Sequence, residues 1–127
     1  MKNTKFYICA HCRNIVEMVH DAGVNPVCCG QKMDELIPNT VEASGEKHVP
    51  VVTVKGSTVE VNVGSVDHPM VDVHWIEWVQ VQTENGSQRK YLNPGENPHV
   101  VFELGEEEPV AVYAYCNLHV LWKTELN

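Results

Sequence analysis

The stretch Val51-Val52-Thr53-Val54-Lys55-Gly56-Ser57-Thr58-Val59-Glu60-Val61-Asn62-Val63 decides the fold of this chain. Residues 51–54 and 58–63 are two runs rich in valine and threonine, and Gly56-Ser57 separates them. β-Branched side chains favour strands, and a short glycine-containing segment between two such runs favours a tight turn. The stretch therefore predicts a β-hairpin.

The rest of the chain after residue 48 continues this pattern. Val71, Val73, Trp75, Val79 and Val81 recur every second residue, with Glu77 as the one interruption, and predict a strand through residue 81. Asn85-Gly86 then predicts a type I′ turn. Further strands are predicted over residues 99–104, 110–116 and 119–123. About seven short strands without a helical period predict an antiparallel β-sandwich over residues 48–127.

The first 37 residues form a different block. This short, turn-rich stretch holds four of the five cysteines and too few apolar residues for a core of its own. A bound metal must therefore supply the missing folding free energy. Residues 38–47 are polar and irregular and are predicted to be a linker. The expected fold class is all-β, with a small metal-stapled domain before the sandwich.

Composition limits the location and the partners of the protein. The chain of 127 residues is 43% hydrophobic and has a formal net charge of −8. No apolar run approaches the roughly 18 residues of a membrane span, and the N-terminus lacks the apolar core of a secretory signal. We therefore expect a cytoplasmic protein that does not bind membranes. We expect no nucleic-acid partner, because the sequence has no clusters of lysine and arginine. Five cysteines in a cytoplasmic chain favour metal binding over disulfides.

The four N-terminal cysteines can enclose one metal ion. Cys9 and Cys12 form a C-x-x-C pair, whose spacing lets one turn direct two thiolates at one ion. Cys28 and Cys29 are adjacent, so they can share an ion only from a distorted turn, and Gly30 after them is consistent with such a turn. Structural zinc is one interpretation of this site. Tetrahedral sulfur accepts iron equally well.

A second group combines one thiol with four imidazoles. Cys116 and His119 stand three positions apart near the end of the chain, and His48, His68 and His74 lie upstream. Five such ligands would leave one octahedral position open to a substrate. Each histidine alone is more commonly a surface or core residue, and a lone Cys116 is more commonly a small hydrophobic residue. Their combination favours a metal site. His99 lies outside these patterns and is predicted not to be a ligand.

These motifs, taken in order, resemble desulfoferrodoxin, the two-iron superoxide reductase. The resemblance rests on five stretches: Cys9-x-x-Cys12 followed by Cys28-Cys29, Glu46-Lys47-His48-Val49-Pro50, His68-Pro69-Met70, His74-Trp75-Ile76-Glu77-Trp78 and Cys116-Asn117-x-His119. It covers nearly the whole chain. It implies a desulforedoxin-like domain with a four-cysteine iron centre, then an immunoglobulin-like sandwich with a second mononuclear iron.

The resemblance also implies roles for individual residues. His48, His68, His74 and His119 would be the equatorial ligands of the second iron, and Cys116 its axial thiolate. Glu46 and Lys47 would be the catalytic residues near the open position. The implied reaction is the one-electron reduction of superoxide to hydrogen peroxide without dismutation, in superoxide detoxification. A homodimer and a rubredoxin-like electron donor are the implied partners.

Two positions depart from the family pattern, and two other functions compete with this interpretation. Arg13 stands where glycine usually follows the first C-x-x-C, which predicts a strained or shifted turn, and Val120 stands where a glycine is expected after His119. The first competing function is an electron carrier or redox sensor whose second metal is structural. The second is a zinc-stabilised interaction module on a β-sandwich.

Overall fold

The chain is almost entirely β-structure. The structure, a computed structural model, describes residues 4–126 and divides the chain into two compact units, residues 1–37 and residues 38–127. The prediction of an all-β chain with a small cysteine-rich block before larger antiparallel sheets is confirmed. Among the described residues, no helix is long and apolar enough to cross a membrane.

The first unit is a small three-stranded sheet with an attached hairpin. Its strands are β1 (Phe6–Ile8), β2 (Ile15–Glu17), β3 (Val27–Cys28), β4 (Gln31–Lys32) and β5 (Asp34–Glu35). Strand β1 pairs with β2 and β5 to give the order β2-β1-β5, and β3 pairs with β4. Tyr7, Cys9 and Met33 form a small buried cluster. Strands this short and this few bury little apolar surface, which agrees with a unit that depends on a metal.

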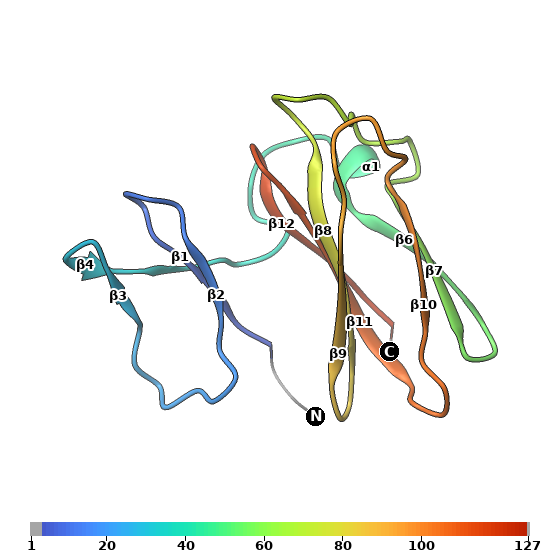
Figure 1. Cartoon of the computed structure of the whole chain (residues 1–127), viewed down its shortest axis with the longest axis horizontal. Coiled ribbons are helices and arrows are strands. Elements are labelled where there is room, and N and C mark those ends of the chain that lie inside the picture. The colour runs from blue at the N-terminus through green and yellow to red at the C-terminus, as the bar shows by residue number, and fades with distance from the viewer. Residues whose placement is uncertain (1–3, 127) are drawn as a thin grey trace. The chain divides into compact units, whose positions relative to one another are not determined.

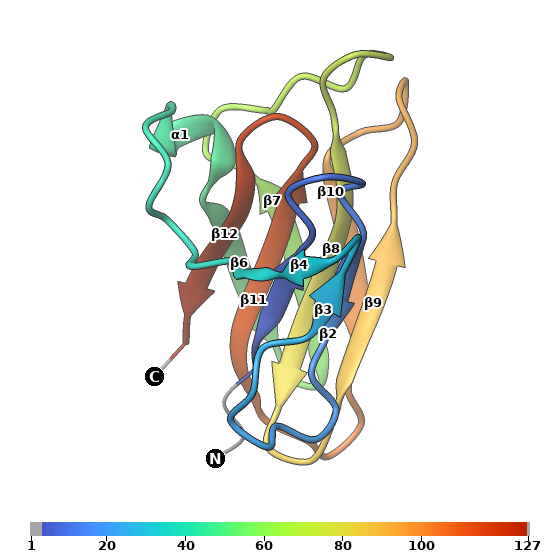
Figure 2. The same ribbon diagram turned by 90° about the vertical axis from the view of Figure 1, so that its left-hand side faces the viewer.

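The second unit consists of two antiparallel sheets. Its elements are α1 (Gly45–His48), β6 (Pro50–Lys55), β7 (Thr58–Val63), β8 (Ile76–Thr83), β9 (Ser87–Tyr91), β10 (His99–Glu103), β11 (Pro109–Cys116) and β12 (Val120–Glu125). One sheet has the order β10-β7-β6 and the other β12-β11-β8-β9 (Figures 1 and 2). The predicted hairpin is present as β6 and β7, and Gly56 in its turn has a φ of 61°.

The core of this unit lies between the two sheets. Alternate residues of β7 and β10 face alternate residues of β8 and β11, because side chains on a strand point to opposite faces in turn. The buried cluster contains Val59, Val61, Val63, Val100 and Phe102 from one sheet, and Ile76, Val79, Val81, Val112, Ala114 and Cys116 from the other. Cys116 is therefore the last inward-facing residue of β11.

Strand pairing fixes which loops share an end of the sandwich. Cys116 pairs with Ile76 at one end of the β8–β11 ladder, and Pro109 pairs with Thr83 at the other end. The turn after β11, the segment before β8 and helix α1 consequently lie at one end, and the β8–β9 and β10–β11 loops lie at the opposite end (Figure 1).

Three local predictions are wrong. Residues 71–75 are not part of a strand, because β8 begins at Ile76 and the side chains of Val71 and Val73 are 53% and 75% exposed. The Asn85-Gly86 turn is not of type I′, because neither residue has the positive φ that this turn requires. Residues 45–48, predicted as linker and strand edge, form the single helical turn α1.

Candidate metal centres

Five side chains from four segments converge at one end of the sandwich. His48 ends helix α1, His68 and His74 lie in the β7–β8 connection, Cys116 ends β11, and His119 lies in the β11–β12 turn. Ligand atoms of His48, His68, His74 and Cys116 all lie within 4.8 Å of one another. The structure thus brings together residues that are up to 71 positions apart in the sequence.

The imidazole nitrogens are spaced as ligands of one ion would be. The Nε2 atom of His48 lies 3.1 Å from Nδ1 of His119 and 3.2 Å from Nε2 of His68. Nitrogens bound at right angles to one metal at about 2.1 Å would lie about 3.0 Å apart. Nδ1 of His119 lies 4.0 Å from the Cys116 sulfur. One ion can therefore be reached from all of these atoms.

Backbone carbonyls hold two of the rings in a tautomer suited to metal binding. Nδ1 of His48 donates to the Ser44 carbonyl at 2.7 Å, and Nδ1 of His68 donates to the Pro69 carbonyl at 2.7 Å. Since each proton sits on Nδ1, each Nε2 presents a lone pair. Such carbonyl contacts are the usual outer shell of histidine ligands.

His74 supplies independent evidence for an ion. Its Nε2 atom is buried and is the one buried side-chain N or O atom among residues 4–126 without a hydrogen-bond partner. A buried polar atom without a partner is costly, and a bound cation would satisfy it. Burial lowers the pKa of His48 and His74, and lowers that of His68 to about 4, so the rings are held neutral as ligands must be.

Cys116 brings a buried sulfur to the same site. Burial raises the pKa of its thiol, and the backbone N–H of His119, 3.4 Å from the sulfur, acts in the opposite direction. A metal cation would remove the thiol proton outright. The Trp122 indole N–H donates to the His119 carbonyl at 3.0 Å and fixes the turn that carries both residues. The donor set of four imidazoles and one thiolate suits iron.

The four N-terminal cysteines form the second cluster. The ligand atoms of Cys9, Cys12, Cys28 and Cys29 all lie within 4.8 Å of one another. The Cys12 and Cys28 sulfurs are 3.6 Å apart, and those of Cys28 and Cys29 are 3.9 Å apart. Tetrahedral ligands with metal–sulfur bonds of about 2.3 Å would have sulfurs about 3.8 Å apart. The geometry fits a closed four-thiolate site.

Local backbone geometry explains how adjacent cysteines share one site. Cys29 has a φ of 52° and Gly30 a φ of 76°, so the predicted distorted turn is present. Arg13 has a φ of 67°, a conformation that glycine adopts without strain. A hydrogen bond from the Cys12 N–H is the main cause that lowers the pKa of Cys9 to about 6. Contact with the Cys12 sulfur is the main cause that raises the pKa of Cys29 to about 12. These crowded sulfurs need a cation to be thiolates together.

Glu46 and Lys47 lie on α1 directly before His48. Glu46 is exposed and Lys47 is half-buried. Burial is the main cause that lowers the pKa of His48, and the positive charge of Lys47 acts in the same direction. The Glu46 carbonyl accepts hydrogen bonds from the Val66 N–H at 2.9 Å and the Ser65 hydroxyl at 3.2 Å.

Three supporting residues were missed by sequence reasoning. Ser44 orients His48 through its carbonyl, and a carbonyl leaves no sequence signal. A Cβ atom on Gly64 would lie 2.5 Å from the Glu46 carbonyl oxygen, so only glycine permits this approach. The Asn117 side chain binds the backbone on both sides of His74. Its position inside Cys116-x-x-His119 is the signal that could have identified it.

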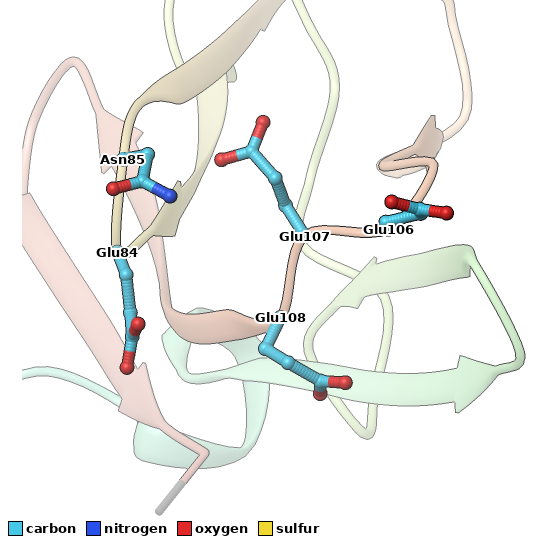
Figure 3. Close-up of a pocket in the computed structure, with 5 residues that line it drawn as sticks. All are labelled: Glu84, Asn85, Glu106, Glu107 and Glu108. Carbon is cyan, nitrogen blue, oxygen red and sulfur yellow. The ribbon is translucent and has the colours of Figure 1, made fainter.

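A separate pocket lies at the opposite end of the sandwich. It is lined by Glu84, Asn85, Glu106, Glu107 and Glu108 (Figure 3). The four carboxylates point in different directions, and the Thr83 hydroxyl donates to Glu107 at 2.6 Å. Since these groups do not converge on one point, we assign no site here.

Comparisons with known proteins agree with this geometry. A sequence profile of the desulfoferrodoxin family matches residues 40–125. The desulfoferrodoxin of Nitratidesulfovibrio vulgaris is 43% identical over 121 residues, which are 95% of each chain. The crystal structure of the superoxide reductase from Treponema pallidum superposes with a TM-score of 0.81 at 35% identity, covering 98% of this chain and 100% of that one. A superoxide reductase of Giardia intestinalis, described as 1Fe-SOR, has a TM-score of 0.56 at 26% identity and covers 65% of this chain and 98% of its own.

Proposed function

This chain belongs to the desulfoferrodoxin family, and from that membership and the two clusters we propose how it works as a superoxide reductase. Two iron centres are expected, one at the four cysteines and one at the histidines with Cys116. The convergence of four imidazoles and one buried sulfur on a single point carries the proposal. It favours superoxide reduction over an electron carrier with a structural second metal and over a zinc-stabilised module.

We propose that His48, His68, His74 and His119 hold the catalytic iron with Cys116 as the fifth ligand. When bound, this iron supplies the single electron that, together with two protons, converts superoxide to hydrogen peroxide. The two Nδ1–H···O=C contacts keep His48 and His68 neutral and directed at the ion. Cys116 contributes the one negative charge of the donor set. These five residues would hold the iron beside the superoxide that it would reduce.

Lys47 is proposed to attract superoxide to the iron, and Glu46 to take its place after it has left. Ferrous iron with four neutral imidazoles and one thiolate carries a net charge of +1, and Lys47 adds a second positive charge nearby. Beyond about 8 Å the remaining negative charge of the chain is largely screened at physiological salt. Local cations therefore attract superoxide despite the formal net charge of −8. Glu46, on α1 before His48, is proposed as a carboxylate that would bind the iron once superoxide has left.

The proposal also covers the division of the chain into domains, the partners and the location of the protein. We propose residues 1–37 as the four-cysteine iron domain, residues 38–47 as the linker and active-site loop, and residues 48–127 as the superoxide reductase domain. A rubredoxin-like electron donor, a homodimer and a cytoplasmic location rest on the family resemblance and on the composition of the chain. Sedimentation of the iron-loaded protein tests the dimer.

The reaction itself can be tested by its products. Ferrous protein mixed with superoxide should be oxidised once per superoxide consumed and should yield one hydrogen peroxide per superoxide, without oxygen. Stopped-flow absorbance with a peroxide assay and an oxygen electrode measures all three quantities. Dismutation would instead give one oxygen for every two superoxide ions and leave the oxidation state unchanged. That result would contradict the proposal.

A further inference from the structure

We propose that Asn117 is a positioning residue that fixes His74 in the catalytic metal site. Its side-chain oxygen accepts the Trp75 N–H at 2.9 Å, and its side-chain nitrogen donates to the Val73 carbonyl at 3.0 Å. One amide thus binds the peptide groups on both sides of His74. The inference rests on the proposed role of His74 as a ligand, and it adds a residue that acts through that ligand.

His74 needs such support more than His48 and His68 do. The rings of His48 and His68 are oriented by backbone carbonyls, but no hydrogen bond orients the His74 ring within residues 4–126. The position of this ring therefore depends on its edge contacts with the His68 and His119 rings and on the backbone that carries it.

That backbone lies outside the sheets and is held by polar contacts. The His74 N–H and carbonyl both pair with Val71, at 3.0 Å each, in an isolated bridge. Val71 and Val73 are exposed, so hydrophobic packing contributes little to this segment. With the two Asn117 contacts, the backbone polar groups from the Val73 carbonyl to the Trp75 N–H are all bonded.

Asn117 also links His74 to the other ligands through its position in the chain. It lies between Cys116 and His119 in the β11–β12 turn, and its own N–H faces the Trp75 carbonyl at 3.3 Å. The clamp therefore joins the segment that carries His74 to the turn that follows Cys116 and contains His119. It thus connects the backbone of three of the five proposed ligands.

The contacts explain why an amide stands at this position. Asparagine offers a donor and an acceptor on one rigid group, which matches one carbonyl and one N–H. Aspartate would keep the acceptor for Trp75 but would place a carboxylate oxygen against the Val73 carbonyl. Alanine would remove both contacts and leave a polar backbone segment unsupported.

The chain contains a matched control. Asn39 clamps strand β12 in the same manner, since its side-chain nitrogen donates to the Lys123 carbonyl at 3.0 Å and its oxygen accepts the Lys123 N–H at 2.8 Å. This clamp touches no proposed ligand and no residue next to one. Asn39→Ala therefore reports the cost of losing an amide clamp, together with the cost of alanine at the left-handed φ of 62° of this position, away from the metal site.

The experiment compares Asn117→Ala and Asn117→Asp with Asn39→Ala in the full-length, iron-loaded protein. We expect both Asn117 variants to bind the catalytic iron roughly 10- to 100-fold more weakly, the loss typical of outer-shell substitutions, and to lose it to a chelator correspondingly faster. The iron of the four cysteines should be released at the wild-type rate. Amide hydrogen exchange at Trp75 should be faster in Asn117→Ala than in Asn117→Asp, which retains the acceptor. Asn39→Ala should change neither quantity.

A double substitution separates positioning from general stability. If Asn117 acts through His74, then adding Asn117→Ala to His74→Ala should not accelerate iron release further, because the ligand that Asn117 positions is already absent. An equal acceleration in both backgrounds would overturn the proposal. So would wild-type iron release in both Asn117 variants, or release from Asn39→Ala as fast as from Asn117→Ala. Should Asn117→Ala fail to fold, Asn117→Asp gives the same comparison.

These measurements stand apart from the proposed reaction. Hydrogen exchange at Trp75 and iron release are read without superoxide, so they test the clamp even if the wild-type protein does not reduce superoxide. Conversely, a protein that reduces superoxide normally in the Asn117 variants, with unchanged iron release, would leave the proposed function intact and remove this inference alone.

Discussion

The Nε2 atom of His48 lies 3.2 Å from the Nε2 atom of His68, and neither nitrogen carries a proton to share. Two lone pairs at this distance repel each other unless a cation lies between them. A metal cation between the two nitrogens would accept both lone pairs. Burial of these rings disfavours their protonation, so a proton does not take the place of the cation.

Metal removal should accordingly destabilise the sandwich unit. A ligand that binds only the folded state contributes about 4 kcal/mol at a thousandfold excess over its Kd. We expect iron-loaded protein to unfold at a clearly higher urea concentration than metal-free protein, and His68→Gln to abolish most of this difference. His99→Gln is the matched control, because His99 is exposed and lies outside the cluster. Equal unfolding midpoints with and without iron would count against the site.

Replacing Cys116 by serine should abolish superoxide reduction and leave the visible spectrum of the four-cysteine centre unchanged. A hydroxyl is a harder and weaker donor than a thiolate, and this sulfur is the one soft ligand of its cluster. Cys12→Ser is the reciprocal variant: it should disrupt the four-cysteine spectrum and spare the reaction of the other centre. A loss of superoxide reduction in Cys12→Ser would show that the two centres are not independent.

Lys47→Ala should slow the encounter with superoxide without loss of iron. One cation beside the path of an anion raises association rates by up to roughly tenfold, and salt weakens this effect. The wild-type rate should fall as ionic strength rises, and the rate of the variant should fall less steeply. Lys55→Ala is the control, because Lys55 lies at the far end of β6. Identical salt slopes for the wild type and Lys47→Ala would contradict steering by this residue.

Sequence patterns predicted those parts of the fold that local chemistry determines. The hairpin of β6 and β7 follows from two valine-rich runs around Gly56, and the two clusters follow from residues of unusual metal affinity. Residues 71–75 alternate like a strand, but the structure uses this segment to place His74, and its valines stay exposed. Alternation of residue types does not distinguish a strand from such an exposed segment. Long-range contacts, such as those of Asn117, determine which of the two forms. Helix α1, with one turn, is too short to produce a helical period.

Gly64→Ala should disturb the metal site from outside it. The added Cβ would lie 2.5 Å from the Glu46 carbonyl oxygen and 3.0 Å from that of Val49, so the backbone around His48 must move. We expect a loss of about 1–3 kcal/mol in the free energy of unfolding, typical of overpacking, and weaker binding of iron at the histidine site. Gly86→Ala is the control, because no atom beyond its two chain neighbours lies within 4 Å of its added Cβ. Chemical denaturation and iron titration measure both effects, and equal behaviour of the two variants would refute the role of this close approach.

Val120 holds a conformation that β-branched residues rarely adopt, with a φ of 58° directly after His119. Left-handed geometry costs a residue with a Cβ atom about 1–2 kcal/mol, and glycine avoids this cost.

Comparison of Val120→Gly with Val120→Ala isolates this backbone effect, because both variants lose the valine side chain. At an ordinary strand position, glycine is less stable than alanine by roughly 0.5–1 kcal/mol. Here we expect the opposite sign, with Val120→Gly the more stable by about 1 kcal/mol in urea denaturation of the metal-free protein. If alanine proves the more stable, Val120 does not adopt the left-handed conformation in solution. The turn that carries Cys116 and His119 would then need a different geometry.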